Sequence, residues 1–137
     1  MNEESSFVDL SSMGIDDVPD VYIMPSGSEV EARIVSAMKK RDKNGTLFIM
    51  PFFDVPAESD VAEFSKYMPL PTEDAGEKEN NNRKRALKLF GECFSIDWSQ
   101  GFEVEEIVGR TGWVLLGVSS SEEYGEQNTV KKFIIQG

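Results

Sequence analysis

The chain carries few residues that could catalyse a reaction or hold a metal. It has 137 residues, no histidine and a single cysteine, Cys93. This excludes Ser-His-Asp triads, Cys-His pairs, Cys/His zinc clusters and intrachain disulfides. The acidic pairs 16–17 and 105–106 are adjacent in sequence, so the two side chains of each pair cannot share one face of a regular element. We therefore expect no catalytic residue, no metal site, no cofactor and no enzymatic activity.

The basic residues are grouped on an otherwise acidic chain. Acidic residues number 25 and basic residues 14, which gives a net charge of −11. Such a charge disfavours indiscriminate binding to duplex DNA but leaves room for a local basic groove. One basic group is interrupted only by Asp42, a second lies at 83–88, and a third near the C-terminus. The first and third groups contain the residues that we predict to contact phosphate: Lys39, Lys40, Arg41, Lys43 and Lys131.

Aromatic residues could supply the flat surfaces on which unpaired bases stack. The segment 47–53 is apolar in both phases of a strand, and a barrel strand has only one inward face, so the other set must be covered by something else. The sequence does not show which phase is outward, and packing in the core remains the alternative for each residue. Our predicted stacking residues are Phe48, Phe52, Tyr67, Trp113 and Tyr124.

Hydrophobic periodicity indicates five strands and one helix. Residues 29–38 alternate with a period of two, and Asn44-Gly45 supplies a hairpin turn before the strand 46–54. Further strands are predicted at 61–70, 111–118 and 128–135. Residues 82–94 carry one apolar helical face, which includes Cys93. Lys131 and Lys132 are neighbours on a strand, so only one can face a groove unless that strand is bulged.

The chain divides into an arm and one domain. Residues 1–28 hold six acidic residues and no basic one, without a sustained apolar period, and we expect a largely extended acidic N-terminal arm. Residues 29–137 form the predicted domain. No apolar run is long enough for a membrane span, no signal peptide precedes the arm, and one free cysteine fits a reducing compartment. We therefore expect a cytoplasmic protein, in a host cell if it is viral.

The order β-β-β-α-β-β suits a small closed barrel, since closure removes the sheet edges. The fold class that we predict is mainly β: a five-stranded OB-type barrel with one helix between strands 3 and 4. Seven segments stand in a characteristic order and spacing: 27–34, 39–45, 47–53, 85–90, 107–110, 111–118 and 123–130. In this order and spacing the chain resembles phage-encoded single-stranded DNA-binding proteins of the OB type.

This resemblance implies binding of single-stranded DNA in phage DNA replication or recombination, without strong sequence preference. Many such proteins recruit replication partners through an acidic C-terminal tail with a terminal aromatic, whereas this chain ends in Phe133-Ile-Ile-Gln-Gly137 and carries its acidic run at the N-terminus. We expect any replication or recombination partner to bind the acidic arm. The sequence leaves the oligomeric state open, homo-oligomers included. An acidic protein-interaction module, or a DNA mimic that occupies a protein's DNA site, remains the alternative.

Overall fold

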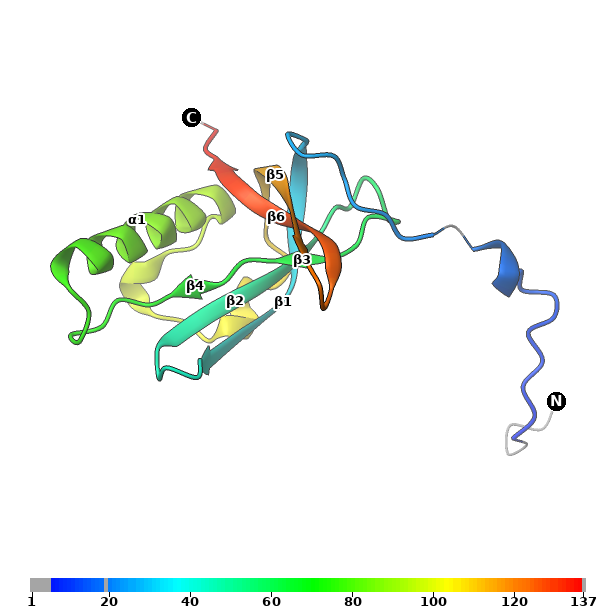
Figure 1. The fold of residues 1–137 in the computed structure, drawn as a ribbon, viewed down its shortest axis with the longest axis horizontal. Helices are drawn as coiled ribbons and strands as arrows, with labels where there is room; N and C mark the ends of the chain where they lie inside the picture. The colour runs from blue at the N-terminus through cyan, green and yellow to red at the C-terminus, as the bar shows by residue number, and fades with distance from the viewer. Residues whose placement is uncertain (1–5, 19, 137) are drawn as a thin grey trace.

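The longest strand, β1 (Glu29–Arg41), is shared between two parts of one sheet. The computed structural model describes residues 6–18 and 20–136. Residues 29–33 of β1 pair antiparallel with β5 (Thr111–Ser121), and residues 33–41 pair antiparallel with β2 (Leu47–Asp54). A register shift between Ile34 and Ser36 lies close to the point where β1 changes partner. Because bulges bend strands, this shift helps β1 to pair with both β2 and β5 (Figure 1).

The remaining strands complete an open antiparallel sheet. They are β3 (Phe64–Ser65), β4 (Met68–Pro69) and β6 (Gly125–Ile134). The strand order is β3-β2-β1-β5-β6, and β4 also pairs with β2. In the described part of the chain no ladder joins β3 to β6, yet the two edges approach each other, because Lys66 Nζ donates a hydrogen bond of 3.4 Å to the Val130 carbonyl oxygen. The protein is therefore mainly β, as predicted, with an incompletely closed sheet.

The helix does not lie where the sequence predicted it. The expected third strand, 61–70, is two short strands, β3 and β4, so α1 (Glu77–Phe94) comes between the fourth and fifth strands and not between the third and fourth. Residues 66–67 separate β3 from β4, and the Lys66 amide donates to the Pro51 carbonyl oxygen within this interruption. Pro51 of β2 has no amide hydrogen to donate to the facing segment, which favours an irregular pairing here.

Helix α1 also begins five residues earlier than the predicted Asn82. Its first turn has no apolar pattern, but Glu77 and Glu79 place negative charge near the helix N-terminus, which is favourable. Asn80 exchanges two hydrogen bonds with the backbone of Thr72, and Arg83 donates to the Leu70 carbonyl oxygen at 2.9 Å. These polar contacts with the preceding loop hold a turn that hydrophobic periodicity does not reveal.

An aromatic cluster joins the helix to the sheet. Phe53 of β2 packs against Phe94 of α1 with ring centroids 5.4 Å apart, and Phe90 lies 5.5 Å from Phe133 of β6. Phe53, Phe90 and Phe94 have no exposed surface. Through these rings helix α1 packs its apolar face against the inner side of the curved sheet, and Figure 1 shows the helix beside the strands.

Close packing after the helix depends on Gly91. The chain turns back through two short 3-10 helices, η2 (Trp98–Gln100) and η3 (Val104–Ile107). Trp98 Nε1 donates to the Leu87 carbonyl oxygen at 3.0 Å, which brings the indole over the helix. A Cβ atom at position 91 would lie 2.4 Å from Trp98 Nε1 and 3.0 Å from the Ile96 carbonyl oxygen. The glycine that weakens the helical pattern is therefore needed for this contact.

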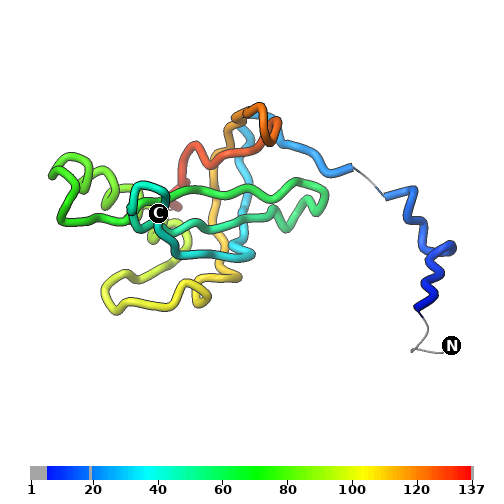
Figure 2. The backbone as a smooth tube through the Cα atoms, turned by 60° about the horizontal axis from the view of Figure 1, so that its bottom comes forward, coloured from blue at the N-terminus to red at the C-terminus, as the bar shows by residue number. Residues whose placement is uncertain are grey.

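The N-terminal segment has two parts. Residues 6–18 include η1 (Ile15–Asp17), are largely exposed and extend away from the sheet (Figures 1 and 2). Residues 22–24, in contrast, are attached to the folded domain. Tyr22 forms an isolated parallel bridge with Val61. Met24 exchanges two hydrogen bonds of 2.9 Å with the buried Asn128 side chain. Glu3 and Glu4 of the predicted arm lie outside the described residues.

Candidate nucleic-acid interface

Four basic residues lie at one end of the β1–β2 hairpin. Lys39, Lys40 and Arg41 end β1, which is longer than predicted, and Lys43 lies in the turn; all four are exposed. Gly45 adopts a positive φ of 83°, as the Asn-Gly signal predicted for this position. Arg41 donates to the Gly45 carbonyl oxygen at 2.9 Å, so its guanidinium is partly engaged within the turn. The three lysines make no ion pair within the described chain, and their ammonium groups are available to phosphate.

The one acidic residue of this hairpin organises the turn. The Asp42 carboxylate accepts hydrogen bonds from Tyr67 Oη at 2.7 Å and from the amides of Asn44 and Thr46 at 2.9 and 3.0 Å. These bonds, that from Tyr67 first, hold the pKa of the Asp42 carboxyl below its usual value. Asp42 therefore fixes the hairpin and links it to Tyr67.

Tyr67 and Phe48 form an aromatic pair beside the hairpin. Their ring centroids are 4.8 Å apart with an interplanar angle of 47°. Phe48 is only 8% exposed because Tyr67, which is 44% exposed, covers it. Tyr67 is thus the surface available for stacking, and Phe48 supports it from below.

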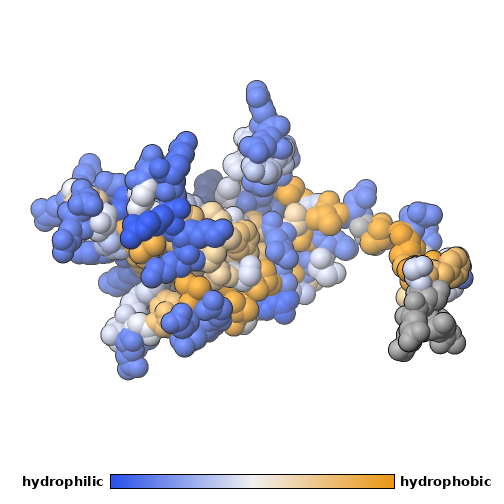
Figure 3. Space-filling view, turned by 90° about the horizontal axis from the view of Figure 1, so that it is seen from below, coloured by the Kyte–Doolittle hydropathy of each residue, from blue (hydrophilic) through white to orange (hydrophobic). Residues whose placement is uncertain are grey.

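The structure resolves which phase of β2 faces outward. Ile49, Pro51 and Phe53 are buried on the core side, whereas Met50 and Phe52 are half-buried on the opposite side, the side of Phe48. Register places Lys40, Met38 and Ser36 of β1 opposite Phe48, Met50 and Phe52. Cross-strand partners share a face, so these six residues form one surface, which we call the outer β1–β2 face. Figure 3, which shows the molecule from below, has exposed apolar residues next to hydrophilic ones.

A bulge in β6 exposes both lysines near the C-terminus. Leu115 pairs with Lys132 and Leu116 with Val130, which leaves Lys131 as an extra residue. Val130 and Phe133 both face the core, so the two lysines between them are both exposed. The Lys131 side chain runs past Gly117, where an added Cβ would lie 3.8 Å from Lys131 Cβ and Cδ. The sequence allowed this arrangement only for a bulged strand.

Two predicted stacking residues lie apart from the basic hairpin. Trp113 is 38% exposed on the outward side of β5, opposite Glu31, in a depression that Glu92 also lines. Tyr124 is 67% exposed in the turn between β5 and β6, beside Glu122, Glu123 and Glu126. Both surroundings are acidic, so neither aromatic shares the electrostatic environment of the outer β1–β2 face.

Arg83 and Cys93 are both engaged in contacts within the fold. Arg83, expected on an exposed helix face, forms an ion pair of 2.6 Å with Glu79 besides its bond to Leu70. Cys93 is half-buried, and desolvation raises the pKa of its thiol. Within residues 6–18 and 20–136 no group of three or more acidic or cysteine side chains is arranged to hold a metal ion.

Several surface residues were missed by sequence reasoning. Met38, Met50 and Ser36 join the outer face only through the β1–β2 register, which a one-residue shift would reverse. For Met50 the apolar pattern gave no signal, because both phases of 47–53 are apolar. In the sequence Asp42 only interrupts the basic group, and its link to Tyr67, which is 25 residues away, appears in the fold.

The chain matches no protein-family model, and no curated protein is significantly similar to it. In the described part of the chain, no helix combines the length and apolar character needed to cross a membrane.

Proposed function

We propose that this chain is a single-stranded DNA-binding protein that acts in phage DNA replication or recombination. The observation that carries the proposal is the outer β1–β2 face: Tyr67 and Phe52 are accessible aromatics, and the lysines of the hairpin lie at the same end as Tyr67. Single-stranded DNA needs both features, because stacking contributes about 1–3 kcal/mol per base and phosphates need positive charge.

The sheet topology supports assignment to the OB type. In an OB barrel the second and third strands and the loops 1–2 and 4–5 face the ligand. Here β1 pairs with both β2 and β5, β5 pairs with β6, and the β3 and β6 edges approach each other through Lys66 and Val130. The 42–46 turn then corresponds to loop 1–2, and the outward side of β2 belongs to one of the two ligand-facing strands. We therefore assign the protein to a partly open OB-type barrel.

Single strands are favoured over duplex DNA for two reasons. A duplex keeps its bases stacked internally, so Phe52 and Tyr67 would gain nothing from it. The net charge of −11 also repels a stiff rod of phosphates more than a flexible strand that can stay near the lysines. Since stacking does not depend on base identity, most positions bind without strong sequence preference.

The exposed arm favours a second, compatible role in protein binding. Residues 6–18 carry Leu10, Met13 and Ile15 at the surface among Asp9, Asp16 and Asp17. An acidic segment with exposed apolar side chains suits a basic, apolar groove on a replication or recombination protein. The alternative of a DNA mimic would use the same acidic residues, but it would leave the outer β1–β2 face without a ligand.

Fluorescence anisotropy with labelled oligo(dT) and a duplex competitor tests the proposal. We expect binding to oligo(dT) that a duplex displaces poorly. Phe52→Ala should weaken this binding by about 1–3 kcal/mol, or roughly 5- to 150-fold. Trp113→Ala is the control, an aromatic that is 38% exposed on the outward side of another strand, and should change affinity little. No anisotropy change at micromolar protein and low salt would refute the function.

A further inference from the structure

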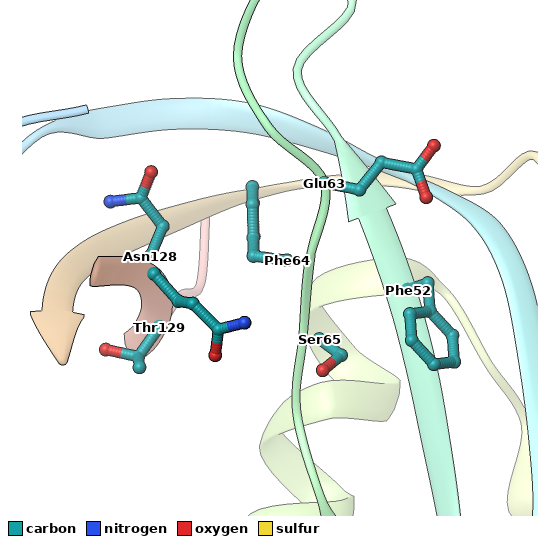
Figure 4. A pocket seen from close by; sticks show the side chains of 7 residues that line it. Phe52, Glu63, Phe64, Ser65, Asn128 and Thr129 are labelled. Carbon is teal, nitrogen blue, oxygen red and sulfur yellow. The ribbon is translucent and has the colours of Figure 1, made fainter. Parts of the chain in front are cut away.

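A notch lies between the unpaired edges of β3 and β6. It has a volume of about 190 Å³, and Phe52, Ser65 and Thr129 are among its lining residues. Ser65 is the cross-strand partner of Phe52, so the two side chains share the outward side of the sheet. Figure 4 shows Ser65 between Phe52 on one side and Thr129 on the other. The notch therefore continues the outer β1–β2 face across the seam of the sheet.

Small residues leave space around the Phe52 ring. Its neighbour on β1 is Ser36 and its neighbour on β3 is Ser65. Across the seam, Thr129 pairs with Gly117 of β5. A row of small side chains flanks one half-buried aromatic, so a planar ligand can reach the ring from the notch.

Four of the polar side chains at the notch have no side-chain partner among the described residues. Glu63, Ser65, Gln127 and Thr129 make no side-chain hydrogen bond or ion pair with any other residue in the described ranges. Asn128, between Gln127 and Thr129, has the opposite arrangement: it is buried, and its amide bonds to Met24 and to the Gly117 carbonyl oxygen. Asn128 thus anchors β6, and its two neighbours are left to meet a ligand.

The chemistry of these side chains suits a base and opposes a phosphate. Glu63, which lies on the same side of β3 as Phe52 (Figure 4), is an acceptor that repels anions. Carboxylates accept hydrogen bonds from the cytosine amine, and glutamine amides recognise adenine through its amine and ring nitrogen. Cytosine and adenine both present an exocyclic amine next to a ring-nitrogen acceptor. Thymine and uracil present a carbonyl oxygen where the amine would be, which faces the carboxylate unfavourably.

We propose that the β3–β6 notch is a base-reading subsite that accepts cytosine or adenine in preference to thymine or uracil. The base stacks at Phe52, its amine donates to Glu63, and the Gln127 amide donates to its ring nitrogen. This inference rests on the proposed function. It adds a preference at one nucleotide position to a surface that otherwise binds any base.

Comparison of oligo(dC) with oligo(dU) at neutral pH isolates the base edge that the notch would read, because the two pyrimidines are similar in size. Cytosine presents an amine and a ring-nitrogen acceptor where uracil presents a carbonyl oxygen and an N–H donor. We expect oligo(dC) to bind about 10-fold more tightly than oligo(dU), the magnitude of a good side-chain contact to one base edge. Glu63→Ala and Gln127→Ala should each bring this ratio close to one. Glu92→Ala on α1 removes the same charge away from the notch, and Gln100→Ala in η2 matches the neutral change; both should keep the ratio.

The outcomes separate this inference from the function on which it rests. Equal affinities for oligo(dC) and oligo(dU), or a preference that survives both Glu63→Ala and Gln127→Ala, would overturn the subsite while leaving single-strand binding intact. Absence of binding to every oligonucleotide would overturn the proposed function together with the subsite.

Discussion

Tyr67 donates a 2.7 Å hydrogen bond to Asp42, and this contact ties the basic hairpin to the aromatic surface beside it. The ring of Tyr67 covers Phe48, and the carboxylate of Asp42 holds the amides of the turn. One pair of residues thus sets the position of the lysines relative to a stacking surface. The acidic residue within this basic cluster therefore fixes the geometry of the hairpin.

The Tyr67–Asp42 contact predicts two shifted titrations. The bond to Asp42 raises the pKa of Tyr67 above its usual 10.0, so its stabilisation is present below pH 10 and is lost as pH rises through the raised pKa. The pKa of Asp42 is lowered below 3.8, so its stabilisation is present above that pH and is lost as pH falls through the lowered pKa. We expect Asp42→Asn to return the Tyr67 pKa towards 10.0 in an NMR titration of the tyrosine rings.

Tyr22 provides the control for this titration. Its hydroxyl donates to Glu58, which raises the Tyr22 pKa in the same way. Glu58→Gln should lower the pKa of Tyr22 and leave Tyr67 unchanged, and Asp42→Asn should do the reverse. A Tyr67 pKa that does not respond to Asp42→Asn would show that the two side chains do not interact in solution.

Two triple variants separate local from general electrostatics. Lys39→Ala, Lys40→Ala and Lys43→Ala together should weaken single-strand binding and reduce the slope of log K against log salt by about 2, at about 0.7 per phosphate contact. The control replaces three exposed basic residues of α1 by alanine and removes the same charge: Lys84, Arg85 and Lys88. Arg83 is left in place because it bonds to Leu70 and Glu79.

The helix variant should change the salt slope little, since charges beyond the Debye length of about 8–10 Å are screened. Equal losses in the two triple variants would mean that only net charge matters. A larger loss in the helix variant would place the binding surface on the α1 side of the sheet.

Gly91→Ala should destabilise the protein although alanine is the better helix former. Helix propensity favours alanine by about 1 kcal/mol, but the added methyl group would overlap the Trp98 indole and press on the Ile96 carbonyl oxygen. Overpacking of this kind costs about 1–3 kcal/mol. Urea denaturation should therefore show a lower midpoint for Gly91→Ala. Gly76→Ala, where an added Cβ meets nothing within 4 Å, should change the midpoint much less.

The N-terminal segment should divide into a dispensable and a structural part. Removal of residues 1–18 should leave the melting temperature unchanged, because residues 6–18 are largely exposed. Removal of residues 1–24 takes away both Met24 partners of the buried Asn128 amide, and an unsatisfied buried polar group costs about 1–3 kcal/mol. A thermal melt of the two truncations tests this, and equal melting temperatures would contradict the structural role of residues 20–24.

Removal of residues 1–18 should also tighten single-strand binding at low salt. It eliminates five acidic residues that otherwise repel phosphate. The gain should fade as salt rises, because exposed charges are screened. Weaker binding after this truncation would mean that the arm itself contacts DNA.

The sequence predicted those elements whose signals are local. Alternation of Val30, Ala32 and Ile34 and the Asn44-Gly45 turn were sufficient for the β1–β2 hairpin. The first turn of α1 was missed because Asn80 and Arg83 stabilise it through loop contacts and not through an apolar face. The outward phase of β2 and the β6 bulge at Lys131 depend on strand pairing across the sheet, which no single strand encodes. The main strands and the helix were therefore accessible from sequence, whereas the division of β3 from β4, the place of α1 in the order and the detailed outer β1–β2 face were not.

Amide NMR spectra recorded during a titration with oligo(dT) test the central claim most directly, because they locate the ligand without a mutation. We predict that the largest shifts fall on β1 from Ser36 to Arg41, on the 42–46 turn, on β2, and on Ser65 and Tyr67. The backbone of α1 and the outward side of β5 around Trp113 should change little. Shifts concentrated on α1 or around Trp113, with β2 unaffected, would contradict the assignment of the outer β1–β2 face as the DNA-binding surface.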